Sequence, residues 1–163
     1  MSLPSPNRVL IIGVGHHWRG DDAAGLLVAS RLRAQGRDPA VVREMSGEAA
    51  DLLNAWQEAA AVIIVDAVLT KAPPGTIYRF DAHAEPLPAE IFPACSTHAW
   101  GVAEAVALGR ILQRLPPHLI IYGIAGQNFG LGPGLSPPVE TAIVEVTQRI
   151  LKELSLILGS KMD

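Results

Sequence analysis

Two unbroken runs of apolar residues constrain the fold of this chain most strongly, VLIIGV at Val9–Val14 and AVIIV at Ala61–Val65. A strand with one face in water alternates apolar and polar residues, whereas a continuous apolar run is typical of a strand covered on both faces. Helices that connect parallel strands provide such cover. The two runs therefore indicate an α/β fold with a buried sheet.

Strand and helix patterns alternate along the rest of the chain, which predicts a three-layer α/β/α sandwich around a mostly parallel sheet. The length of 163 residues fits a single domain over residues 1–163. The third helix is apolar over most of its circumference, so we expect it to be well covered. The predicted strands are Val9–Val14, Ala40–Arg43, Ala61–Val65, Ile77–Phe80 and Leu119–Ile124. The first two predicted helices cover Asp22–Gln35 and Glu48–Gln57. The third opens within Ser96–Trp100 and runs to Leu115, and the fourth begins at Pro137 with Ser136 as its N-cap.

Composition excludes several classes of partner. The formal net charge is -3 and the basic residues are scattered, so nucleic acid is not an expected partner. Cys95 is the single cysteine, which rules out an internal disulfide and fits a reducing compartment. No apolar run approaches the roughly 18 residues that a membrane span needs. We expect a cytoplasmic protein without membrane insertion.

The stretch GVGHHWRGDD, Gly13–Asp22, follows the first strand and invites comparison with a nucleotide-binding loop. A dinucleotide loop of the form G-x-G-x-x-G leaves helix amides bare for a pyrophosphate. Here the third glycine comes late, at Gly20, after two histidines and a tryptophan. Asp21 and Asp22 would also place negative charge where the anion must sit. The acids therefore disfavour nucleotide binding, although it remains an alternative.

Acidic residues at the strand ends are the stronger candidates for a site, because ligands of open α/β sheets bind outside the carboxyl ends of the strands. Asp21 and Asp22 both suit the start of a helix, but adjacent helical residues do not share a face. We expect Asp21 to be a helix cap and Asp22 to face the cleft. Asp66 directly follows the AVIIV run, where an ionised carboxylate needs donors, water or a cation.

His98, in CSTHAWG, is predicted at the start of the third helix on the same rim. Taken alone, it is best interpreted as a polar residue at a helix start. Together with two carboxylates it completes an oxygen and nitrogen ligand set suited to nickel, zinc or manganese. Three protein ligands leave positions open for substrate or water.

Three motifs resemble those of the [NiFe]-hydrogenase maturation endopeptidases: GVGHHWRGDDAAG, VIIVDAV and STHAWGVAEAV, in that order. The resemblance implies a protease that removes a C-terminal extension from a hydrogenase large-subunit precursor after nickel insertion. It implies metal ligands at Asp22, Asp66 and His98, with the nickel supplied by the precursor and zinc or another divalent metal able to substitute. It also implies a five-stranded mixed sheet whose fourth strand, about Ile77–Phe80, is antiparallel.

One position departs from the family pattern, since His16 stands where an asparagine is usual. His16, His17 and Ser96 are candidates for substrate contact, and no residue is assigned as general base. Two alternatives stay open. One is a metallopeptidase of related fold with its own bound metal, and the other is a non-catalytic module that binds metal or nucleotide.

Overall fold

The computed structural model describes residues 8–36, 40–91 and 101–159. These residues form a five-stranded sheet of order β2-β1-β3-β5-β4. Neighbouring strands are parallel except β4, which runs antiparallel to β5. The mostly parallel sheet with an antiparallel fourth strand is thereby confirmed. The strands are β1 (Val9–Val14), β2 (Ala40–Met45), β3 (Ala61–Val68), β4 (Ile77–Asp81) and β5 (His118–Ala125).

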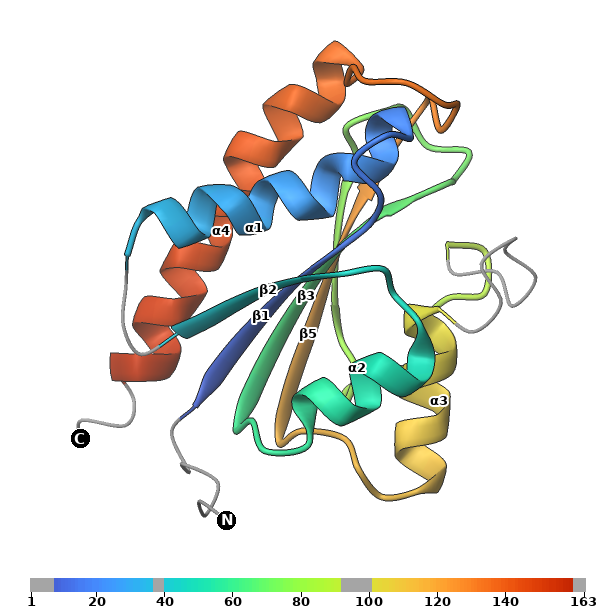
Figure 1. The fold of residues 1–163 in the computed structure, drawn as a ribbon. Helices are drawn as coiled ribbons and strands as arrows, with labels where there is room; N and C mark the ends of the chain where they lie inside the picture. The colour runs from blue at the N-terminus through green and yellow to red at the C-terminus, as the bar shows by residue number, and fades with distance from the viewer. Residues whose placement is uncertain (1–7, 37–39, 92–100, 160–163) are drawn as a thin grey trace.

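Helices cover both faces of the sheet, as the unbroken apolar strands predict. On one face lie α1 and α4, and on the other lie α2 and α3 (Figure 1). A short 3-10 helix, η1, precedes α1. The bounds are η1 (Gly20–Ala23), α1 (Ala24–Ala34), α2 (Ala49–Trp56), α3 (Val102–Ile111) and α4 (Pro137–Gly159).

Two hydrophobic cores lie on the two sides of the sheet, and the side chains of β3 alternate between them. Ile63 and Val65 pack toward α1 and α4, whereas Ile64 and Val68 pack toward α2 and α3. Because side chains alternate along a strand, Asp66 lies on the face of Ile64 and Val68. The candidate carboxylate therefore faces the side covered by α2 and α3.

The strand order reverses between the parallel strands β1 and β3. The chain passes from β1 to its neighbour β2 and then returns to place β3 on the other side of β1. In open α/β sheets such a switch point leaves a crevice at the carboxyl ends of the strands, where ligands bind. The structure thus points to the carboxyl ends of β1 and β3.

Several boundaries differ from the sequence prediction by a few residues, and those close to the acidic residues matter most. The first helix begins as the 3-10 turn Gly20–Ala23 rather than as an α-helix at Asp22. Strand β3 runs on to Val68, so Asp66 lies inside the strand and not after it. The described part of α3 starts at Val102, and the predicted start at 96–100 lies outside the described residues.

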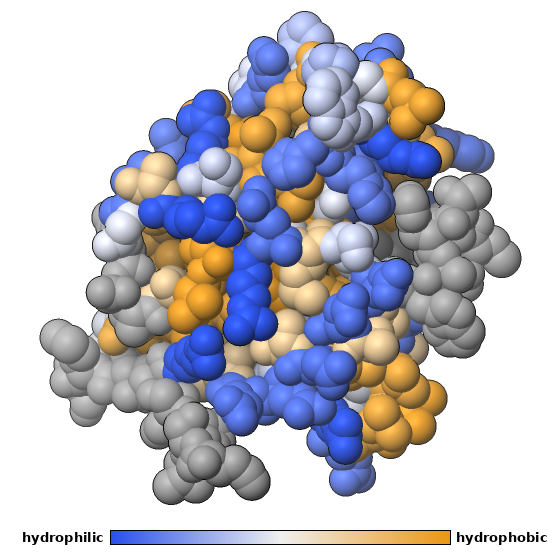
Figure 2. Space-filling model, in the orientation of Figure 1, coloured by the Kyte–Doolittle hydropathy of each residue, from blue (hydrophilic) through white to orange (hydrophobic). Residues whose placement is uncertain are grey.

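Helix α3 is also less covered than expected. Leu108, Ile111 and Leu112 near its end are exposed, with Ile111 at 78%. An apolar patch lies over α3 in Figure 2, and it is one of several on a face where apolar and polar areas alternate. In the described part of the chain, no helix combines the length and apolar character required to cross a bilayer.

Candidate functional site

Asp66 stands at the open edge of the β1–β3 pair. The last paired residues of these two strands are Gly13 and Val65, while β3 continues beside β5 with Asp66 opposite Gly123. Asp66 is therefore the first residue of β3 beyond the end of its pairing with β1. The chain that leaves β1 returns to this edge through η1, which carries Asp22.

The two carboxylates act on each other. Burial raises the pKa of Asp66 well above its usual value, and the negative charge of Asp22 raises it further, against a lowering by the backbone amide of Ala67. The Oδ2 atom of Asp22 is itself shielded from solvent. Two poorly solvated carboxylates at one edge repel each other unless a proton or a cation lies between them. Such oxygen donors fit a divalent metal ion.

Glycines permit this approach of η1 to the strand ends. A side chain at Gly25 would place its Cβ 2.3 Å from the carbonyl oxygen of Val65 and 2.5 Å from that of Val14. Gly15 has a φ of 154°, and a Cβ there would lie 1.9 Å from the carbonyl oxygen of Asp22. The glycines thus bring the backbone of the acidic turn onto the sheet and do not form a phosphate cradle.

Asp21 was expected to cap its own helix, and this prediction is wrong. Arg19 occupies the N-cap of η1, and no side chain caps that turn. Instead the fully buried Asp21 carboxylate accepts hydrogen bonds from the amides of Gln127, Asn128 and Ser136 and from the Ser136 hydroxyl, at 2.7 to 2.9 Å. The acid binds a distant loop because its own turn is packed against that loop.

The pKa of Asp21 reflects these bonds. Burial alone would raise it, but the three backbone amides and the hydroxyl of Ser136 outweigh burial and lower the pKa below its usual value. The pKa values of the two acids are therefore shifted in opposite directions, that of Asp21 downward and that of Asp66 upward. The two adjacent acids have separate roles: Asp21 fixes the turn, and the charge of Asp22 acts on Asp66.

The structure does not bring the other predicted site residues together with Asp22 and Asp66 in the ranges that it describes. His17 is exposed, with its Nε2 3.7 Å from Glu44 Oε1 on β2, and His16 is half-buried in the same loop. Ser96 and His98 lie outside the described residues. Within the ranges that the structure describes, no three histidine, cysteine or acidic side chains gather closely enough to hold a metal ion. The third ligand position, assigned to His98, stays a prediction.

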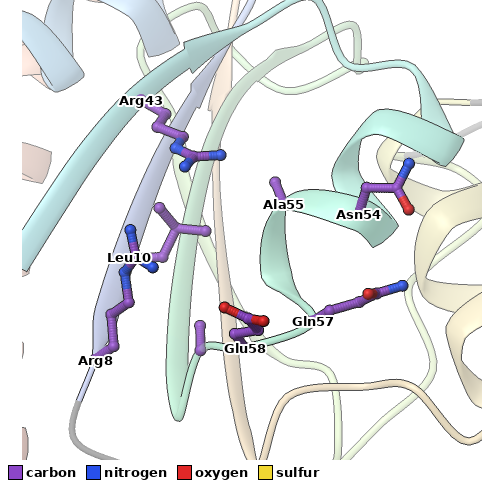
Figure 3. A pocket seen from close by; sticks show the side chains of 8 residues that line it. Arg8, Leu10, Arg43, Asn54, Ala55, Gln57 and Glu58 are labelled. Carbon is purple, nitrogen blue, oxygen red and sulfur yellow. The ribbon is translucent and has the colours of Figure 1, made fainter. Parts of the chain in front are cut away.

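A groove of about 150 Å³ lies elsewhere, between the sheet and α2. Figure 3 shows Arg8 and Arg43 reaching over it from the strands, opposite Asn54 and Glu58 from the α2 side. Arg8 precedes β1 and Glu58 precedes β3, so this groove is at the amino ends of those strands. It is separate from the acidic site.

The fold and the site together define a class: a three-layer α/β protein with paired acids at the switch point of its sheet. Residues 27–153 match the family model described as hydrogenase maturation protease. The chain belongs to this family and is an enzyme of the maturation protease kind.

Individual relatives agree with this assignment. The hydrogenase 2 maturation protease of Escherichia coli K12 is 28% identical over 150 residues, covering 90% of each chain. The HupD hydrogenase expression/formation protein of Rhodobacter capsulatus is 26% identical over 89% of this chain and 72% of its own. The solved structure of the maturating endopeptidase HybD from E. coli superposes with a TM-score of 0.76 at 25% identity, covering 90% of this chain and 91% of that one.

Proposed function

We propose that this protein is the endopeptidase that removes the C-terminal extension of a [NiFe]-hydrogenase large-subunit precursor after nickel has been inserted. The observation that carries the proposal is the pairing of Asp22 with Asp66 at the switch point of the sheet, in a chain of the hydrogenase maturation protease family. The relative named hydrogenase 2 maturation protease supports the substrate class.

In this proposal the nickel ion belongs to the substrate. Asp22 and Asp66 supply carboxylate oxygens to it, and His98 supplies an imidazole nitrogen. The raised pKa of Asp66 supports this role, since a divalent cation relieves the repulsion that disfavours two ionised carboxylates. A precursor that carries nickel is held with its adjoining chain over the carboxyl edge, and an empty precursor is not.

No residue is assigned as the catalytic base. We place the reaction in the cytoplasm, because a chain with a single cysteine forms no internal disulfide and suits a reducing compartment. Its main competitor is a metallopeptidase of the same fold with a resident metal. The two hypotheses differ in whether the free enzyme contains a metal ion and in whether cleavage requires a precursor that carries nickel.

The test incubates the purified full-length protein with a large-subunit precursor, either nickel-loaded or nickel-free, and measures intact mass. We expect loss of the extension from the nickel-loaded precursor alone, and less than stoichiometric metal in the free enzyme. Equal trimming of both precursors, or a tightly held equivalent of zinc in the free enzyme, would favour the competitor instead.

A further inference from the structure

Two loops at the carboxyl edge are joined into one unit. One follows β1 and carries Trp18, and the other, residues 126–136, leads from β5 into α4. The amide of Gly132 donates to the carbonyl of Trp18 at 2.9 Å, and the amide of Gly20 donates to the carbonyl of Gly132 at 3.1 Å. Arg19 and Gly132 form a parallel β-bridge. The loops therefore hold each other in register at their tips.

Asp21 fixes the base of the same pair of loops. Its backbone amide donates to the carbonyl of Asn128 at 2.8 Å, and its carboxylate takes the amides of Gln127 and Asn128. Contacts at both tip and base leave the loop pair little freedom to rearrange. Side chains on it are presented in nearly fixed positions.

Two large apolar side chains project from this loop pair into solvent. Trp18 is 67% exposed and Leu131 is 86% exposed. Their backbones are neighbours across the two loops, because the carbonyl of Trp18 accepts from the amide of Gly132, the residue that follows Leu131. The loop 126–136 contains no charged residue, so nothing in it would repel an apolar partner. Apolar surface on a rigid rim is typical of a binding site.

The place of this surface identifies its occupant. Trp18 and Asp22 lie on the same short connection between β1 and α1, and η1, which carries Asp22, packs against β3, which carries Asp66. A polypeptide that brings its metal to the two acids must pass along the adjoining rim. The exposed residues of α3 differ in this respect, since Ile111 ends a helix that runs from the carboxyl edge of the sheet toward the amino edge.

We propose that Trp18 and Leu131 form a contact surface, the Trp18–Leu131 surface, that binds an apolar side chain of the precursor polypeptide near the scissile bond. The inference rests on the proposed function and adds a specificity element to it. Trp18 contributes a broad rigid face, and tryptophan is enriched among residues that dominate binding energy. Preformed loops lower the ordering cost of the contact.

The first test measures the kinetics of trimming of a nickel-loaded precursor by Trp18→Ala and Leu131→Ala. We expect KM to rise about tenfold for each variant, with kcat and thermal stability unchanged, because neither side chain supports the core. Leu131→Met should restore a near-normal KM. Ile111→Ala and Leu156→Ala are matched controls, being 78% and 73% exposed at the other end of the molecule. Wild-type KM in the Trp18 and Leu131 variants would overturn the proposal.

A second readout does not depend on cleavage. The chain has three tryptophans, of which Trp18 is exposed, Trp56 is fully buried and Trp100 lies outside the described residues. In a Trp100→Phe background, quenching of tryptophan fluorescence by acrylamide is therefore expected to report largely on Trp18. Adding the precursor should protect this emission, and the protection should vanish in Trp18→Phe. Protection without trimming would refute the proposed function and retain the surface. Trimming without protection would refute the surface and retain the function.

Discussion

The carboxylate of Asp21 accepts two hydrogen bonds from Ser136, one from the backbone amide and one from the side-chain hydroxyl, each at 2.7 Å. Ser136 stands at the predicted N-cap position of α4, where its carbonyl accepts from the amides of Val139 and Glu140. Its hydroxyl is turned away from α4 toward Asp21. This one contact therefore ties the start of α4 to the turn that carries Asp22.

Removing that contact should destabilise the protein. Asp21→Ala leaves three part-buried amides and a hydroxyl without their acceptor, which we expect to cost about 3 kcal/mol of unfolding free energy. Urea denaturation followed by circular dichroism measures the loss. Asp51→Ala, at an exposed acid on α2, is the control and should change stability by about 0.5 kcal/mol or less. Equal effects at both positions would contradict the role assigned to Asp21.

Asp66→Asn should raise stability at neutral pH. Because the folded-state pKa of Asp66 is raised, the native protein binds a proton more readily than the unfolded chain above the ordinary value of 3.8. Wild-type stability therefore falls as pH rises from about 4 through the raised pKa. The variant has no such charge and should lack that part of the decline. Thermal melts of both proteins at several pH values test this. A variant that melts below wild type at pH 7 would refute it.

Gly25→Ala should misplace the acidic turn. The new Cβ would meet two backbone carbonyls, those of Val65 and Val14, and neither can move without distorting the sheet. We expect a loss of about 1 to 3 kcal/mol, as for overpacking in a core, together with loss of trimming activity. Gly159→Ala is the control, because nothing lies within 4 Å of a Cβ there. Wild-type stability and activity in Gly25→Ala would show that the close approach is unimportant.

Glu153 on α4 should matter more than its neighbours on that helix. Its carboxylate accepts from the hydroxyl of the buried Tyr122 and from Arg79 Nε at 2.9 Å, joining α4 to β5 and β4. Glu153→Ala should cost about 1 to 2 kcal/mol, since it leaves the Tyr122 hydroxyl without its acceptor. Glu145→Ala breaks only the exposed pair with Arg149 and should cost about 0.5 kcal/mol or less. Chemical denaturation of the two variants compares them.

The sequence predicts the layers of this fold well because burial leaves a local pattern. The unbroken runs at Val9–Val14 and Ala61–Val65 reveal strands covered on both faces, and the positions of Asp22 and Asp66 follow from the rule for strand ends. The extension of β3 past Asp66 was not foreseen, because pairing with Gly123 on β5 sustains a strand that carries an acid.

The role of Asp21 could not be predicted from the sequence for a different reason. Its donors lie 106 to 115 residues further along the chain, and hydrophobic periodicity carries no information about which distant loops meet. From the sequence alone, an acidic residue beside a helix start is therefore interpreted as a helix cap. The assignment of His98 remains a prediction carried by its motif.

In the proposed function, Asp22 and Asp66 hold the nickel carried by the precursor. The most direct measurement is the rate at which Asp22→Asn and Asp66→Asn trim a nickel-loaded precursor, compared with wild type and with Asp51→Asn as control. We expect Asp22→Asn and Asp66→Asn each to slow trimming on the order of 100-fold, and Asp51→Asn to leave the rate unchanged. Trimming by either site variant at the wild-type rate would contradict it.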